Sequence, residues 1–325
     1  KDQVSIKDDE REKLQIDDVI FDIAGNPDRG YALSIRGVAR EIAGAFDLKF
    51  SDPVEKLRGL TFEKTGEGVQ PKIEDKNAAS VFYLRTMSKL DPKAATPIWM
   101  RRRIEKMGMR SISLVVDVTN YVMLELGQPL HAFDADAIQG NRITVRRART
   151  NEKLTTLDGI ERTLHSDDQV IADTQGPMCL AGVYGGEKSG VSDATQRVVL
   201  ESAYFDPVVT RKMAKRHGLS TDASFRFERG VDPDLIQIAL QRAAHLLQEW
   251  TGCKIVGVKQ VNAGELPTGA TIDLEWDQLD RLIGVSLDRS AVREICGNLD
   301  VLIQEETATS LTLQMLYQVI NLLLV

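Results

Sequence analysis

The chain has 325 residues, of which 42% are hydrophobic and 27% charged, and its formal net charge is −7. This balance is ordinary for a soluble globular protein, and the length exceeds what one hydrophobic core usually supports, so two or three domains are expected. The net negative charge argues against a general nucleic-acid binder, because any contact with nucleic acid would need local basic patches.

The three cysteines are widely separated and form no Cys-x-x-Cys pair, which argues against a structural zinc site and against a disulfide framework. We therefore expect a reducing, cytoplasmic compartment. No apolar run approaches the length of a membrane span. Lys1 in place of an initiator methionine suggests a fragment of a longer chain.

The N-terminal part predicts a charged tail, a strand and a helix. Residues 1–16 lack apolar periodicity, and residues 18–23 have the composition of a strand. Ser34 is expected to cap a helix that runs to about Asp47. The apolar residues at helical spacing predict its buried face: Ile35, Val38, Ile42 and Phe46. Residues 51–80, mixed in Pro, Gly, Lys and Glu, predict a linker.

A basic helix is expected after a strand near residues 79–85. Thr96 and Pro97 mark its first turn. Cations then cluster at five positions: Arg101, Arg102, Arg103, Lys106 and Arg110. Such a run is either a solvated helix face or a set of phosphate contacts, and the sequence leaves both readings open.

Residues 111–134 combine an apolar helix with polar groups. The apolar residues follow the 3.6-residue helical period, and Gly127 and Pro129 end the helix. Thr119 and Asn120 lie inside the helix although both side chains favour caps and turns. His131 follows in a predicted loop. These residues either converge on a site or belong to a core helix and a hydrogen-bonded loop histidine.

Residues 142–257 mix strands and helices, which predicts the α+β class. Strands are expected at residues 143–147, 169–172, 179–184 and 197–202, with a hairpin-type turn at 157–159. A short helix from Pro207 carries four cations: Arg211, Lys212, Lys215 and Arg216. The longest helix is expected from Pro233 to Gly252.

A glycine-rich turn and one carboxylate are further candidates for chemistry. Residues 182–190 have Glu187 where a phosphate loop needs glycine, so a tight turn with close backbone approach is the better prediction. Glu201 lies in an otherwise apolar strand, where it is either neutralised by Arg226 or Arg229 or accepts a hydrogen bond from a ligand hydroxyl. No Ser-His-Asp, Cys-His or His-Glu-x-x-His pattern is evident, so any hydrolysis would position water instead of using a protein nucleophile.

The C-terminal part predicts a small separate unit after a linker at residues 258–270. A strand at 271–274 precedes helices at 277–283 and 288–296, a helix-turn-helix shape. The second helix offers only Arg289 and Arg293 for reading DNA. Residues 315–325 form an apolar tail that is too short to span a bilayer.

Six segments together resemble the β subunit of bacterial phenylalanyl-tRNA synthetases, in that family's order, between about residue 18 and residue 313. They are RGVARE at 36–41, VVDVTNYV at 115–122, LGQPLHAFD at 126–134, LAGVYGG at 180–186, LES at 200–202 and RFERGVDP at 226–233. The resemblance implies an editing domain that hydrolyses tyrosine wrongly esterified to the phenylalanine tRNA, followed by a small winged-helix-like domain.

The resemblance also implies roles for individual residues. Catalytic residues that position water and the terminal adenosine would be His131, Thr119 and Asn120. Substrate-binding residues would be Glu201, as acceptor for the tyrosine hydroxyl, with Gly182, Gly185, Thr221 and Ala223 shaping the pocket. Arg110 would contact tRNA, and no metal ligand is implied.

The expected domain division is an N-terminal segment at 1–75, an editing domain at 76–257, a truncated winged-helix-like domain at 268–314 and an apolar tail at 315–325. Partners implied by the resemblance are the phenylalanine tRNA and the synthetase α subunit, in a heterotetramer of two α and two β subunits. The intact enzyme would use ATP and magnesium at an α-subunit site, and this part needs no cofactor and no membrane. The family's Ser-Trp-Arg-Pro-Asp stretch is missing after Leu313. Alternatives are a noncatalytic scaffold that binds tRNA or a protein partner, and a helix-turn-helix protein that binds nucleic acid.

Overall fold

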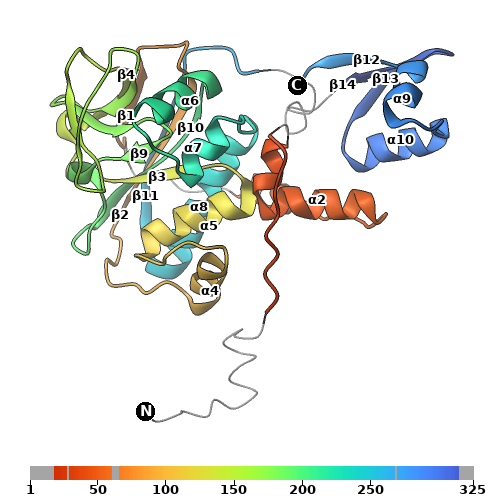
Figure 1. Ribbon diagram of the computed structural model, residues 1–325. Helices are drawn as coiled ribbons and strands as arrows, with labels where there is room; N and C mark the ends of the chain where they lie inside the picture. The colour runs from red at the N-terminus through yellow and green to blue at the C-terminus, as the bar shows by residue number, and fades with distance from the viewer. Residues whose placement is uncertain (1–17, 28, 61–65, 268, 315–325) are drawn as a thin grey trace, which may run out of the picture.

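The computed structural model describes residues 18–27, 29–60, 66–267 and 269–314. Its fold is α+β, as the mixture of strand and helix patterns predicts. Two β-sheets and a layer of helices make up the larger part of the molecule, and a small unit of two helices and three strands lies beside it (Figure 1).

A four-stranded antiparallel sheet forms the middle layer, with strands in the order β11-β2-β10-β3. Their bounds are Ala79–Ser88 (β2), Leu130–Asp134 (β3), Arg197–Phe205 (β10) and Lys254–Asn262 (β11). After its first residue, β10 is buried along its whole length. Such burial on both faces is typical of a strand that lies between two packed layers.

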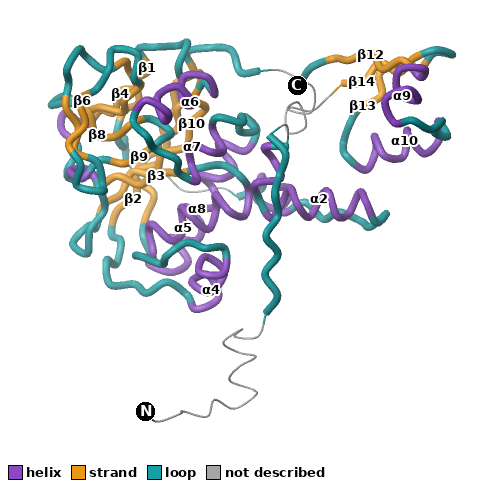
Figure 2. Tube along the Cα trace, in the orientation of Figure 1, coloured by secondary structure: helices purple, strands orange, loops and turns teal. Residues whose placement is uncertain are grey.

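The two faces of β10 pack against different layers. Leu200 belongs to a core shared with the helices α5 (Leu114–Leu126) and α8 (Leu235–Thr251). Val199 and Phe205 belong to a second core, shared with a five-stranded sheet. Its strands are Gln70–Ile73 (β1), Arg142–Arg147 (β4), Gln169–Ala172 (β7), Pro177–Leu180 (β8) and Tyr184–Gly185 (β9). Figure 2 shows the α5 and α8 helices together on one side of the strands.

Helices begin and end at the residues that local chemistry favours. The carboxylate of Asp206 accepts a hydrogen bond from the Val209 amide at the start of α6 (Pro207–Arg216). Gly127 and Gly252 end α5 and α8 in the left-handed conformation, with φ of 89° and 67°. Further described helices of this part are α3 (Pro53–Arg58), α4 (Ile98–Lys106) and α7 (Asp222–Phe227). In addition, Lys153–Thr155 (β5) pairs with Glu161–Thr163 (β6).

The C-terminal unit is winged-helix-like. It consists of β12 (Thr271–Glu275), α9 (Trp276–Ile283), α10 (Arg289–Asn298), β13 (Leu302–Glu306) and β14 (Ser310–Gln314). Trp276, Val292 and Leu311 lie in its own small core. The expected tails at 1–16 and 315–325 lie outside the described residues, and the expected domain boundaries stay a prediction.

Several sequence-based expectations were wrong in detail, among them the linker at 51–80, which contains α3 and β1, and the linker at 258–270, into which β11 extends. Residues 18–23 form no strand, and Val19 and Phe21 are 73% and 79% exposed, because no neighbouring strand pairs with this segment. His131 lies in strand β3, not in a loop. The strand expected at 179–184 is two short strands, β8 and β9, because the chain turns at Gly182 with φ of 70°.

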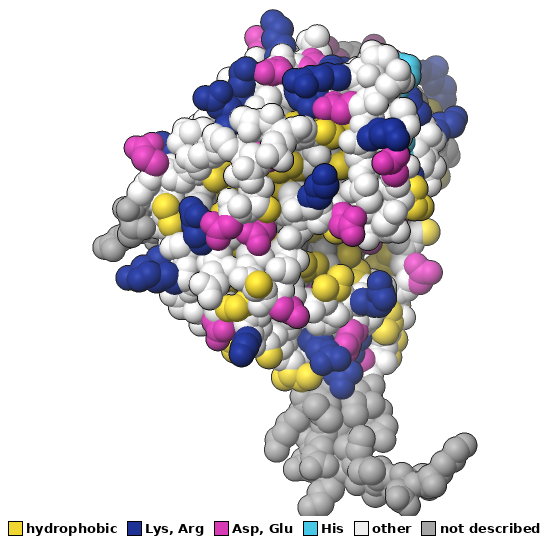
Figure 3. Space-filling view, turned by 90° about the vertical axis from the view of Figure 1, so that its left-hand side faces the viewer, with side chains coloured by type: hydrophobic (Ala, Val, Ile, Leu, Met, Phe, Trp, Pro, Cys, Tyr) yellow, Lys and Arg dark blue, Asp and Glu magenta, His cyan; other side chains and the backbone are white. Residues whose placement is uncertain are grey.

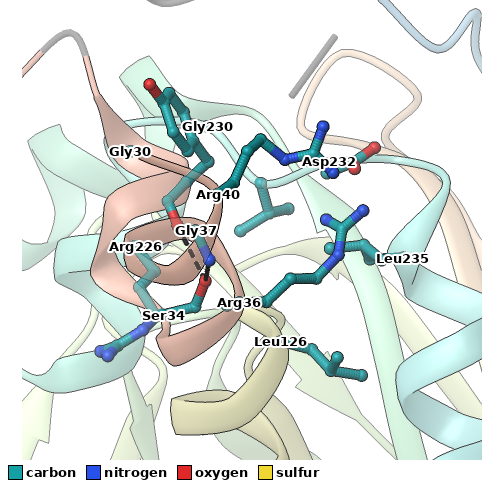
Figure 4. Close-up of a pocket in the computed structure, with 13 residues that line it drawn as sticks. Gly30, Ser34, Arg36, Gly37, Arg40, Leu126, Arg226, Gly230, Asp232 and Leu235 are labelled. Carbon is teal, nitrogen blue, oxygen red and sulfur yellow. Dashed lines mark hydrogen bonds between the residues drawn. The ribbon is translucent and has the colours of Figure 1, made fainter. Parts of the chain in front are cut away.

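The helix expected after Ser34 exists as α2 (Ile35–Ala45), but its predicted buried face was wrong. Ile35 and Ile42 are about half exposed and Phe46 is 72% exposed, whereas Arg36 and Arg40 are buried. Figure 4 shows these two arginines extending from α2 toward Asp232 and Leu235, in a hollow that Arg226 also lines.

An acidic partner makes the burial of these arginines possible. Nε and Nη2 of Arg36 donate to the two carboxylate oxygens of Asp52, at 2.9 and 2.6 Å. Nη2 of Arg40 lies 3.3 Å from Asp52, and Arg40 also pairs with Asp300 of the winged-helix-like unit. Buried guanidinium groups are tolerated when carboxylates neutralise them, and a periodicity rule based on apolar residues does not anticipate this.

Among the helices of the described residues, none combines the length and apolar character needed to cross a membrane. The surface seen in Figure 3 carries cationic and anionic side chains interspersed, with no large field of one sign on that face.

Gly37 allows α2 to approach the preceding 3-10 helix, Gly30–Leu33, which yields the first prediction. A Cβ atom at residue 37 would lie 2.0 Å from the carbonyl oxygen of Tyr31, and backbone cannot move aside cheaply. We expect Gly37→Ala to lower the free energy of unfolding by about 2–3 kcal/mol. Urea denaturation measures this change in the free energy of unfolding.

Gly44→Ala is the matched control on the same helix. Its Cβ atom would make ordinary contact, 3.4 Å from the Leu299 side chain. Because alanine favours helix interiors over glycine, we expect the free energy of unfolding to rise by up to about 1 kcal/mol. Equal effects of the two substitutions would contradict the close approach of Gly37 to Tyr31.

Candidate functional site

A hollow of about 390 Å³, open to solvent, lies where β3, β10 and the turn between β8 and β9 meet α7. Its walls are mainly apolar, with a few polar groups that converge on it, which is typical of a small-molecule site. The lining residues are Pro129, Leu130, His131, Cys179, Leu180, Gly182, Val183, Tyr184, Gly185, Glu201, Phe205, Ala223 and Phe227.

Strand pairing brings the two ionisable groups of the hollow together. In the antiparallel pair of β3 and β10, His131 lies directly opposite Glu201. Directly opposed residues point to the same face, with Cβ atoms about 4.5–5.5 Å apart. The adjacent Leu200 points to the other face, toward the helices, so the alternation of β10 fixes Glu201 on the side of the hollow.

Burial perturbs the pKa values of both groups in opposite directions. It raises the pKa of Glu201 to about 8 and lowers the pKa of His131 to about 4, because a desolvated site disfavours each charged form. Near pH 7 the carboxyl group is therefore mainly protonated and the imidazole neutral. Burial, and then the charge of Glu201, raise the pKa of the Cys179 thiol, which keeps this thiol protonated as well.

The hydrogen-bonding capacity of this pair is unused. Nε2 of His131 is buried and has no hydrogen-bond partner among the described residues. The imidazole packs edge-on against Phe133, with ring centroids 4.6 Å apart. Glu201 forms no ion pair or hydrogen bond within the described part of the chain, since Arg226 pairs with Asp222 and Arg229 pairs with Glu228. Unsatisfied buried polar groups are costly, so they mark a place where a ligand would be stabilised.

Backbone forms another wall because two glycines leave no room for side chains. At Gly182, where φ is 70°, a Cβ atom would lie 2.8 Å from the Phe205 ring. At Gly185 it would lie 2.8 Å from Leu157 and 3.0 Å from Cε1 of His131. The peptide groups of this turn can therefore approach a ligand directly.

The N-terminus of α7 supports the glycine turn from outside the hollow. Oγ1 of Thr221 donates to the carbonyl of Val183 at 2.8 Å and accepts from the Ser224 amide at 3.0 Å. Thr221 therefore links the helix cap to the turn, although it does not line the hollow itself. Ala223, two residues further on, does line it.

Five of the nine residues singled out from the sequence line one hollow, namely His131, Glu201, Gly182, Gly185 and Ala223. Thr119 and Asn120 lie in α5 and do not line it, and Oγ1 of Thr119 donates to the Val116 carbonyl at 2.7 Å. Arg110 is exposed between α4 and α5. The roles proposed for these three residues stay predictions.

Sequence reasoning missed the aromatic wall of the hollow. Phe205 lies four residues after Glu201 on β10, so strand alternation alone could have placed both on the same face. Phe227 packs edge-on against Phe205, with ring centroids 5.1 Å apart, and no signal in the sequence pairs them. Over the described ranges, no three His, Cys, Asp or Glu side chains gather as a metal site would require.

A comparison with protein-family models decides the family. The model described as the B3/4 domain matches residues 78–252, a range that includes every residue lining the hollow. The chain belongs to the B3/4 domain family.

Two relatives of this B3/4 domain chain carry the same protein name. The phenylalanine–tRNA ligase beta subunit of Streptomyces avermitilis is 48% identical over 285 residues, covering 86% of this chain and 34% of that protein. The beta subunit of Pectobacterium atrosepticum is 44% identical over 292 residues, covering 90% of this chain and 36% of the relative. These matches confirm the resemblance found in the motifs, and the chain spans about a third of the length of these relatives.

A solved structure is also similar, an N-terminal fragment of the phenylalanyl-tRNA synthetase beta-subunit from Pyrococcus horikoshii. The similarity has a TM-score of 0.43 at 16% identity and covers 96% of this chain and 89% of that one. A similarity this distant supports no conclusion about individual residues of the B3/4 domain.

The raised pKa of Glu201 predicts how the stability of the B3/4 domain depends on pH. An unfolded glutamate titrates near pH 4.5, whereas Glu201 in the fold has a pKa of about 8. The native protein holds this proton more tightly, so the stabilisation is complete below about pH 4.5 and is lost as pH rises through 8. Glu201→Gln removes this titration.

We therefore compare the free energy of unfolding of Glu201→Gln with that of wild type at pH 5 and at pH 8.5. As the pH rises from the first value to the second, the difference should shift in favour of Glu201→Gln by at most about 5 kcal/mol. Urea midpoints at the two pH values measure the change. Glu161→Gln, at a side chain 58% exposed, is the control and should show little change between them. A difference between Glu201→Gln and wild type that is the same at both pH values would contradict the raised pKa.

Proposed function

We propose that this chain is the part of a phenylalanine–tRNA ligase beta subunit that hydrolyses the ester of tyrosine wrongly attached to the phenylalanine tRNA. The observation that carries the proposal is the cross-strand pair of His131 and Glu201 in an apolar hollow, both desolvated and neither side chain hydrogen-bonded to another described residue. Such a hollow suits an aromatic side chain with one polar group.

Discrimination between tyrosine and phenylalanine would come from the carboxyl group of Glu201. A protonated carboxyl can both donate to and accept from a phenolic hydroxyl, without the cost of burying a charge. Phenylalanine would leave this buried carboxyl without a partner, at a cost of about 1–3 kcal/mol. An apolar synthesis pocket rejects an added hydroxyl poorly, so a second site that binds the hydroxyl selects in the opposite direction.

Water would be the nucleophile in this reaction. Burial keeps the Cys179 thiol protonated by raising its pKa, so a thiolate is not available for attack. A pKa of about 4 makes His131 a weak general base at neutral pH, which favours a role in orienting water through a hydrogen bond. The peptide groups of the Gly182–Gly185 turn would face the ester carbonyl, and Thr119 and Asn120 would contact the terminal adenosine.

The whole synthetase supplies the remaining parts of this proposal. The relatives that match are about three times longer than the matched region, and this chain covers 34–36% of them. Ligation of phenylalanine with ATP and magnesium, the α-subunit partner in a heterotetramer and a cytoplasmic location are therefore proposed for the intact enzyme. Arg110 is proposed to contact the tRNA.

The winged-helix-like unit gives little support to the alternative that this chain is a helix-turn-helix protein that binds DNA. Arg289 donates to the Ala308 carbonyl at 2.9 Å and lies over the Trp276 ring, and Arg293 pairs with Glu306 at 2.8 Å. Both arginines of the second helix are therefore engaged within the unit. A noncatalytic tRNA-binding scaffold remains the main competitor, and a deacylation assay with tyrosyl-tRNA separates it from an editing enzyme.

Substitution of Glu201 tests the source of discrimination. We expect Glu201→Ala to reduce the preference for tyrosyl over phenylalanyl ester by about 5- to 100-fold, because the hydroxyl loses its partner. Glu201→Gln should keep most of the preference at pH 7, since a carboxamide resembles a protonated carboxyl. Deacylation rates of the two aminoacyl-tRNAs measure both. An unchanged preference in Glu201→Ala would remove Glu201 from the proposed role.

Substitution of His131 tests the positioning of water. We expect His131→Ala to slow deacylation of tyrosyl-tRNA by about 10- to 1,000-fold, which is the range for loss of a group that orients or activates water. Circular dichroism should show an intact fold. His165→Ala, at a histidine whose side chain is 55% exposed, is the control and should retain the wild-type rate. Equal rates for the two variants would exclude His131 from the site.

A further inference from the structure

Helix α6 displays a concentration of positive charge that the fold does not use. Arg211, Lys212 and Lys215 are exposed, while Thr210, Met213 and Ala214 form the buried face. None of the three cations has an ion pair or hydrogen bond with another described residue, although Arg216 pairs with Asp168.

This charge is unfavourable for the helix itself. Arg211 and Lys215 are four residues apart, as are Lys212 and Arg216, so like charges face each other on one helical surface. The helix dipole favours cations only in the last turn, which accounts for Lys215 and Arg216 but not for Arg211 and Lys212. An external anion would relieve the repulsion.

The cations of α4, the other basic helix, are mostly neutralised from within. Arg101 and Arg102 of α4 both pair with Glu105, and Lys106 pairs with Asp18. The α4 run suggested phosphate contacts in the sequence, but three of its cations have carboxylate partners and Arg103 donates to the Tyr121 hydroxyl at 3.2 Å. The α6 run has free charge on a chain whose net charge is −7, and local excess of this kind attracts a polyanion.

The position of α6 connects it to the hollow. The chain leaves α6 and reaches Thr221, the cap of α7, within five residues, and Thr221 holds the Val183 carbonyl of the glycine turn. Figure 1 shows α6 and α7 next to each other beside β10. A polyanion bound along α6 would therefore lie against an element that forms one wall of the hollow.

An aromatic ring on the outer side of α7 favours RNA over other polyanions. Phe225 is 37% exposed, on the side of α7 opposite to the pocket residues Ala223 and Phe227, and the guanidinium of Arg229 lies 3.3 Å from its ring centroid. The cations of α6 and an exposed aromatic ring on the neighbouring helix α7 form the combination that single-stranded nucleic acid uses, through phosphate contacts and base stacking.

We propose that Arg211, Lys212 and Lys215 form a phosphate-binding surface that holds the 3′-terminal strand of a tRNA beside the hollow. This inference rests on the proposed function, because the ester would be carried into the hollow by that strand. It assigns to α6 the backbone contacts that the sequence alone suggested for α4.

The test is binding of an RNA hairpin that has a single-stranded 3′ extension and carries no amino acid. Fluorescence anisotropy over a series of salt concentrations measures the affinity. Each lost phosphate contact lowers the slope of log affinity against log salt by about 0.7–0.9. We therefore expect the triple variant Arg211→Gln, Lys212→Gln, Lys215→Gln to bind more weakly at low salt, with a slope reduced by about 2.

The matched control removes the same net charge from exposed cations that have carboxylate partners: Lys72→Gln, Lys153→Gln, Arg197→Gln, which pair with Glu74, Glu161 and Asp136. This control should keep the wild-type slope. A slope unchanged in the α6 variant, or reduced equally in both variants, overturns the proposal.

The RNA assay involves no hydrolysis, so it separates the two proposals. A chain that binds RNA through α6 but cleaves no tyrosyl ester would refute the editing function alone. A chain that cleaves the ester while the α6 variant keeps the wild-type slope would refute the role of α6 alone.

Discussion

The alignment of β3 with β10 is the constraint on which the candidate site depends. It sets His131 opposite Glu201, and a shift of one residue would turn Glu201 toward the helices and Leu200 into the hollow. Two features hold the alignment. Leu200 is buried against the helical layer, and Nε2 of Gln128 donates to the carbonyls of Pro129 and Ala203, at 3.1 and 3.0 Å, which ties the start of β3 to β10.

Desolvation gives this pair its chemical character. Histidine and glutamate at directly opposed strand positions can form an ion pair, but burial shifts the pKa values of His131 and Glu201 to about 4 and about 8, in the directions that keep both groups neutral. A neutral pair can recognise an uncharged hydroxyl and hold a water molecule, and it cannot hold a strong anion. In the proposed function, the burial that would make the site selective would also limit it to mild chemistry based on positioned water.

Much of the fold could be predicted from the spacing of apolar residues and from the residues that begin and end helices. The helix ended by Gly127 and the buried strand around Leu200 were confirmed because their signals lie within a few residues of each other. The buried face of α2 was predicted wrongly because Arg36 is neutralised by Asp52, sixteen residues away, and no local pattern reveals such a partner. Likewise, Glu201 could be recognised as unusual, but whether it met an arginine or a cavity depended on the packing of two sheets and α7.

The glycine turn has a consequence for how the site can vary. Gly182 and Gly185 have no space for any side chain, so at these two positions a ligand faces peptide groups. Point substitutions cannot alter the hydrogen-bonding identity of a peptide group, and at these two positions they would displace Phe205, Leu157 or the imidazole. Changes in ligand preference are therefore expected at the other lining positions, where a single side chain such as that of Glu201 can be exchanged without rebuilding the turn.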